Sequence, residues 1–118
     1  MYRGAYAEIA ADDQGQARRT EYAALDIVVA RLRAARGLGA HDPAFGAALD
    51  SVEALWSLFI QDVASPENAL PAELRKNIVS IGRWIFSTTA VLRNAEEADL
   101  GALIDVNIAI RDGLKEVS

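Results

Sequence analysis

The chain has 118 residues, of which 52% are hydrophobic, and its 12 Lys and Arg against 17 Asp and Glu give a net charge of -5. A net acidic chain repels the phosphate backbone, so direct binding to nucleic acid is not expected. Because cysteine is absent, disulfides, thiolate metal sites and a cysteine nucleophile are excluded. The length fits one domain over residues 1–118, stabilised by packing.

Residues 1–13 lack the basic and then apolar pattern of a signal peptide, and no apolar run approaches the roughly 18 residues that span a bilayer. We therefore expect a cytoplasmic protein without membrane insertion. Strand signals are nearly absent, whereas apolar residues recur at steps of three and four along most of the chain. The predicted fold class is all-α, a small antiparallel bundle of about four helices with a short N-terminal helical arm.

The arm is predicted from Tyr2, Tyr6 and Ile9, which share one helical face. The Asp-Asp-Gln-Gly sequence at 12–15 interrupts this pattern, so a break in the helix is expected there.

The first long helix is predicted over residues 14–36, with Asp13 as its N-cap and Gly37 with Gly39 as its stop signal. Its apolar positions are Tyr22, Leu25, Val29 and Leu32. Ile27 points roughly opposite this face, away from the predicted core.

The start of the second long helix is marked by Asp42, a suitable cap, and Pro43, whose missing N–H costs nothing at the first helical position. Its predicted buried seam contains Phe45, Leu49, Val52, Trp56, Phe59 and Val63. Leu55 and Leu58 are expected to widen this seam.

A tight corner is predicted at Ser65-Pro66-Glu67-Asn68, and Leu70 is pushed toward an extended conformation by Pro71. A third helix is expected to start near Pro71. Its predicted seam contains Leu74, Ile78, Ile81, Ile85 and Leu92, with Thr88 as the one polar member. The opposite, solvated stripe contains Glu73, Lys76, Ser80, Arg83 and Ser87.

The fourth helix is expected to begin between Ala95 and Leu100, because Asn94 and Glu97 have the spacing of a capping box. Its predicted seam contains Leu100, Leu103, Asn107, Ile110 and Leu114. A buried Asn107 must find a hydrogen-bond partner, and its predicted role is to fix the register of the helices.

Catalytic, cofactor-binding and metal sites are not expected. His41, the one histidine, lies in a predicted loop beside Asp42, without neighbours suited to metal binding or proton transfer. The acidic pairs at 12–13 and 96–97 flank helix ends, where they favour helix starts. The two glycines around Leu38 follow no strand, so they do not form a nucleotide-binding loop.

Surplus apolar residues are the main functional signal. On the third helix, Trp84 and Val91 lie on one flank of the seam, while Val79 and Phe86 lie on the other. Together with Ile27, these residues exceed what a small bundle normally buries, which predicts a partner-binding surface. The alternative is that the fourth helix and the arm cover them.

Three segments of the chain resemble the FlaF family of flagellar biosynthesis regulators. They are Trp56-Ser-Leu-Phe-Ile-Gln-Asp62, then Pro66-Glu-Asn-Ala-Leu-Pro71 with Leu74-Arg75, and Ser80-Ile-Gly-Arg-Trp-Ile85. The C-terminal Leu103-Ile-Asp105 and Ile108-Ala-Ile-Arg-Asp-Gly-Leu114 extend the similarity over nearly the whole chain. The resemblance implies a cytoplasmic factor, without enzyme activity, that promotes flagellin synthesis and export and acts with or against a companion regulator, FlbT.

The resemblance also implies that Asn68, Leu70 and Arg75 contact a partner, although the fold alone would need this corner. The leading hypothesis is a flagellin secretion chaperone that holds a flagellin helix in an apolar groove, with Trp84 as anchor. The alternative is a post-transcriptional regulator that acts through FlbT or flagellin mRNA, and a third possibility is a structural subunit of the export apparatus. The sequence leaves the oligomeric state open.

Overall fold

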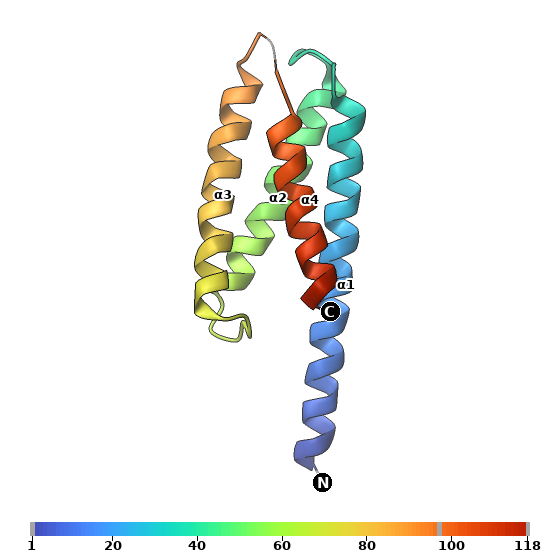
Figure 1. The fold of residues 1–118 in the computed structure, drawn as a ribbon, viewed down its shortest axis with the longest axis vertical. Coiled ribbons are helices and arrows are strands. Elements are labelled where there is room, and N and C mark those ends of the chain that lie inside the picture. The colour runs from blue at the N-terminus through green and yellow to red at the C-terminus, as the bar shows by residue number, and fades with distance from the viewer. Residues whose placement is uncertain (1, 97, 118) are drawn as a thin grey trace.

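The computed structural model describes residues 2–96 and 98–117, with side chains described for residues 19–96 and 98–113. Its helices are α1 (Tyr2–Ala35), α2 (Pro43–Ala64), α3 (Ala72–Arg93) and α4 (Gly101–Val117). The helices alternate in direction along the chain (Figure 1). α1 packs against α2 and α4, and α2 packs against α3. The predicted all-α antiparallel bundle is confirmed, and the described residues contain no strand.

α1 is one continuous helix, so the break predicted at residues 12–15 and the N-cap predicted at Asp13 are wrong. A glycine in a helix costs only about 1 kcal/mol, and a helix already nucleated elsewhere gains a hydrogen bond with each added residue. The expected arm is instead the N-terminal part of α1, which extends beyond the ends of the other helices (Figure 1). The helix ends where predicted, because Gly37 takes the left-handed conformation at φ 86°.

α2 begins as predicted. The Oδ1 atom of Asp42 accepts a hydrogen bond from the backbone N–H of Ala44 at 2.9 Å, and Pro43 is the first helical residue. The inner face of α2 carries its buried residues, Phe45, Ala48, Leu49, Val52, Trp56 and Val63. Leu58 does not widen this seam as predicted, because it lies about 100° around the helix from Phe59, on the outer face.

The corner between α2 and α3 is organised by Asn68. Its Oδ1 atom accepts the backbone N–H of Leu70 at 3.0 Å, and its Nδ2 atom donates to Asp62 Oδ2 at 3.2 Å. Pro71 is the N-cap of α3, close to the predicted start. The backbone of α3 then approaches α2 at Gly82, where an added Cβ would lie 2.5 Å from the Cδ1 atom of Ile60.

The polar member of the α3 seam is Thr89, not the predicted Thr88. The buried face of α3 contains Gly82, Ile85, Thr89 and Leu92. Because Gly82 has no side chain, α3 packs closely at this position, and its buried face is turned away from the predicted row of aliphatic residues. The Oγ1 atom of Thr89 donates to the carbonyl of Phe86 at 3.1 Å, which satisfies the buried hydroxyl within the helix.

α4 begins at Gly101, one residue beyond the predicted interval. Asn94 ends α3 and donates to the carbonyl of Ala90, so its predicted capping of α4 is wrong. The Oδ1 atom of Asp99 instead accepts the backbone N–H of Gly101 at 2.8 Å. Glu97 lies outside the described residues, and Leu114 lies outside the described side chains.

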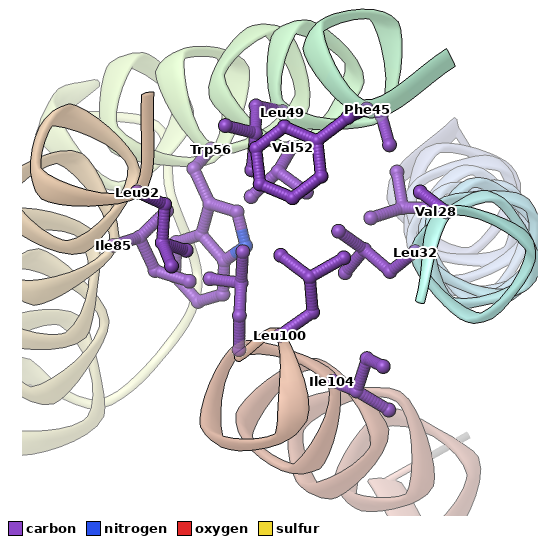
Figure 2. Packing of buried hydrophobic residues seen from close by; sticks show 13 residues of the cluster. Val28, Leu32, Phe45, Leu49, Val52, Trp56, Ile85, Leu92, Leu100 and Ile104 are labelled. Carbon is purple, nitrogen blue, oxygen red and sulfur yellow. The ribbon is translucent and has the colours of Figure 1, made fainter. Parts of the chain in front are cut away.

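The core lies at the centre of the four helices, as Figure 2 shows. Trp56 is fully buried, and its Nε1 atom donates a hydrogen bond of 2.8 Å to Oδ1 of the equally buried Asn107. The amide nitrogen of Asn107 donates to the carbonyl of Leu103 at 2.7 Å. Asn107 therefore has the hydrogen-bond partner that its burial requires, and that partner is Trp56 of α2. The bond between the two side chains links α2 to α4.

Candidate partner-binding surfaces

An apolar groove runs along the outer side of the bundle, where α1 and α2 pack together. It is shallow, with a volume of about 500 Å³, and its lining residues are Ala24, Ile27, Val28, Arg31, Asp50, Ser51, Ala54, Leu55 and Leu58. Ile27 from α1 and Leu58 from α2 remain 53% and 61% exposed. We refer to this surface as the α1–α2 groove.

The polar residues of the α1–α2 groove already have partners within the bundle. Arg31 donates to the hydroxyl of Ser51 at 2.6 Å, and that hydroxyl donates to the carbonyl of Ala47. Asp50 pairs with Arg93 of α3 at 2.6 Å. A partner that covers the groove therefore meets mainly apolar side chains, together with the ion-paired Asp50 and the cation of Arg31, which bonds to a neutral hydroxyl.

Arg93 ties α3 to the outer face of α2. Its guanidinium pairs with Glu53 at 3.0 Å as well as with Asp50. The hydrogen bonds with Glu53, and then with Asp50, raise the pKa of Arg93 above its ordinary value. An arginine is charged at physiological pH in any case, so the raised pKa reflects the two ion pairs that join α3 to α2.

The predicted residues of α3 separate onto two flanks, as the sequence pattern indicated. Trp84 and Val91 are 39% and 70% exposed on one flank. Val79 and Phe86 are half-buried on the other, and Phe86 packs against the core. Ile27 belongs to the α1–α2 groove, so the structure does not bring these five residues into one site.

The corner residues suggested by the family resemblance have structural roles. Asn68 is half-buried and makes the bonds described above, while Leu70 lines an apolar hollow of about 30 Å³ together with Phe59, Ile78 and Ile110, among others. Such a hollow holds no more than a small group. Arg75 differs, because its buried Nε atom has no hydrogen-bond partner among the described residues.

Among the described side chains, Leu58 is one of two leucines that were predicted to lie in a buried seam and are exposed; the other is Leu74 of α3, which is 38% exposed. A signal for Leu58 existed, since the buried seam of α2 steps from Trp56 to Phe59 and then to Val63, and position 58 falls between those steps on another face. Assigning it to the core overlooked the exposed wall that it forms opposite Ile27.

The described residues contain no group of three His, Asp or Glu side chains that could hold a metal ion. Within the same residues, none of the helices has the length and apolar character needed to cross a membrane.

The fold and surfaces define a small four-helix bundle whose outer faces carry exposed apolar side chains. Its sequence matches the family described as Flagellar protein FlaF over residues 2–114, nearly the whole chain. The chain therefore belongs to the FlaF family, which is a family of flagellar regulators. Comparisons with curated proteins and with solved structures gave no match.

Proposed function

We propose that this FlaF-family chain binds flagellin as a cytoplasmic secretion chaperone and so promotes flagellin synthesis and export. The observation that carries the proposal is the α1–α2 groove, whose walls expose Ile27 and Leu58 outside a core of buried residues. A groove between two helices suits an amphipathic helix, whose apolar residues at three- and four-residue spacing fit along it.

The chemistry of the groove agrees with reversible holding of a helix. Its small residues, Ala24, Ser51 and Ala54, allow a helix to approach closely, and Leu55 and Val28 supply an apolar floor. Covering flagellin's apolar helical surface here would prevent it from polymerising before export. The interaction forms no covalent bond, so the partner can be released unchanged.

Trp84 and Val91 offer a second contact for a long partner. Tryptophan is the residue type most often found as an anchor in protein interfaces, and Trp84 is partly exposed on α3. Val79 and Phe86 lie on the other flank of α3, and Asn68, Leu70 and Arg75 lie near its start. In this proposal they are secondary to the α1–α2 groove.

The test is isothermal titration calorimetry of the purified protein with monomeric flagellin. The double variant Ile27→Glu with Leu58→Glu is compared with Ala34→Glu combined with Ala90→Glu, which adds the same charge at exposed positions on α1 and α3. Losing the groove contacts should weaken binding by roughly 30-fold or more, as for about 2 kcal/mol at an interface hot spot.

The control variant should bind flagellin like the unmodified chain. Circular dichroism establishes that both variants fold. If the unmodified protein releases no heat with flagellin, and fluorescence anisotropy also shows no association, the chaperone proposal is wrong. If Trp84→Glu abolishes binding and the groove variant does not, flagellin occupies α3 instead.

A second candidate function is post-transcriptional control of flagellin, through FlbT or flagellin mRNA. Its support is the regulatory character of the family. Contact with the mRNA leader would weaken steeply as salt rises, because protein cations displace condensed counterions from RNA. Binding to FlbT or flagellin through the α1–α2 groove would change little with salt, since that surface is apolar.

A further inference from the structure

A second surface of a different kind lies on the outer side of α3. It is a shallow hollow of about 510 Å³, lined by Ala72, Arg75, Lys76, Val79, Ser80 and Arg83. Five of these positions, all except Arg75, recur at helical spacing along one face, and Arg75 flanks that face. We refer to this surface as the α3 cationic strip.

The three cations of the α3 cationic strip have no carboxylate within ion-pair distance among the described residues. By contrast, Arg93 pairs with Asp50 and Glu53, and Arg111 pairs with Asp26 and Asp112. The chain as a whole carries a net charge of -5. An acidic protein thus concentrates three cations, against the single carboxylate of Glu73, on one side of one helix.

Intramolecular packing does not account for this arrangement. Gly82 and Ile85 make the contact of α3 with α2, whereas Lys76 and Arg83 are exposed. The Nε atom of Arg75 is buried without a hydrogen-bond partner among the described residues, a condition that costs stability.

The α3 cationic strip also has an apolar centre. Val79 is half-buried between Lys76 and Arg83, and Phe86 follows Val79 by seven residues, on the same side of the helix. Ala72 and Ser80 are small, so an approaching segment is not held away by long side chains at those positions. A row of apolar groups bordered by cations is complementary to an amphipathic helix bordered by carboxylates.

We propose that the α3 cationic strip binds an acidic amphipathic helix of a partner protein, with apolar side chains of that helix against Val79 and its carboxylates against Arg75, Lys76 and Arg83. A protein fits this surface better than RNA does. Three cations neutralise at most three phosphates, and the acidic remainder of the chain repels a longer backbone. The apolar centre, moreover, gives a phosphate backbone nothing to contact.

The position of the strip permits two partners at once. The α1–α2 groove lies between α1 and α2, whereas the strip lies wholly on α3, on residues other than those that pack against α2. A helix on one surface leaves the residues of the other uncovered. The inference does not depend on binding at the α1–α2 groove, since the groove and the strip share no residue.

The experiment measures the binding of labelled probes to the full chain by fluorescence anisotropy. The first probe is a synthetic peptide of about 18 residues, with leucines at helical spacing and glutamates on both sides of the leucine stripe. The others are the same peptide with lysine in place of glutamate, the same peptide with glutamine, and a single-stranded RNA oligonucleotide. The variant Lys76→Glu with Arg83→Glu is compared with Arg33→Glu combined with Arg36→Glu, an equal charge change at exposed positions at the end of α1.

The glutamate peptide should bind best, and Lys76→Glu with Arg83→Glu should weaken its binding about tenfold or more at low salt, with the difference shrinking as salt rises. Val79→Ser should weaken binding by a smaller factor that salt does not change. Three outcomes overturn the proposal: equal binding of the glutamate and glutamine peptides, equal loss in the two charge-reversal variants, or preference for RNA. Circular dichroism of each variant confirms that the helices remain.

Discussion

The two faces of α2 carry apolar side chains in opposite situations. Trp56 and Leu58 are two residues apart, yet Trp56 is fully buried and Leu58 is 61% exposed. α1, α3 and α4 surround the inner face (Figure 2). On the outer face, Leu58 lies in the shallow groove beside α1, and Asp50 pairs with Arg93 of α3. Whether an apolar side chain of α2 is buried therefore depends on how many helices surround its face of α2.

The faces also differ in how their polar groups are satisfied. On the inner face, the indole N–H of Trp56 bonds to Asn107 of α4, a residue 51 positions away in the chain. On the outer face, Ser51 and Asp50 bond to Arg31 and Arg93 at the rim. The buried bond ties the helices into one register, whereas the rim bonds leave the apolar floor between them accessible.

The largest effect is expected from Trp56→Ala, which should lower the free energy of unfolding by about 3–5 kcal/mol, because it leaves a cavity where α2, α3 and α4 meet. Urea denaturation followed by circular dichroism measures the loss. A value near that of an exposed substitution would show that the inner face is not the structural core, and the contrast between the faces would disappear.

The hydrogen bond between Trp56 and Asn107 can be tested with a double-mutant cycle. Trp56→Phe leaves the Oδ1 atom of Asn107 unpaired, and Asn107→Leu leaves the indole N–H unpaired, so each should cost about 1–3 kcal/mol. In the double variant neither polar group is left unpaired, and its loss of stability should be smaller than the sum of the single losses. Simple additivity, measured by urea denaturation, would contradict a direct bond.

The N-cap of α2 lies on neither its inner nor its outer face, so its substitution gives a stability change with which the effects at the two faces can be compared. Asp42→Ala removes the side chain that accepts the backbone N–H of Ala44, and it should cost about 1 kcal/mol. Asp42→Asn keeps the acceptor and should lose only a small part of that stability. Thermal unfolding of the two variants measures the difference, and an equal loss would mean that the negative charge matters instead of the hydrogen bond.

Helical spacing was enough to predict the fold and the inner face of α2. Of the predicted seam residues, Phe45, Leu49, Val52, Trp56 and Val63 are buried and Phe59 is partly buried, because a helix surrounded on one side buries one face. The solvated stripe of α3 was predicted for the same reason. The start of α2 followed from its Asp-Pro sequence, which satisfies a helix end locally.

Features that depend on two distant segments were not predictable. The line of contact on α3 passes through Thr89 because Gly82 allows a close approach to Ile60, and a single helix does not reveal how its neighbour is placed. The partner of Asn107 was unknown for the same reason. For the surfaces, the exposure of Ile27, Trp84 and Val91 was predicted, but the pairing of Ile27 with Leu58 in one groove required the packing of α1 on α2.

The smallest effect on stability is expected from Ile27→Gln and Leu58→Gln, each within about 0.5 kcal/mol of the unmodified chain, because exposed side chains lose little on becoming polar. Glutamine keeps the helix propensity high, so the comparison tests burial alone. Urea denaturation should give unchanged midpoints, while the proposed function predicts weaker binding to flagellin by calorimetry. A loss of 2 kcal/mol or so from Leu58→Gln would mean that the outer face is part of the core. The residues of the groove would then stabilise the fold, as the inner face of α2 does.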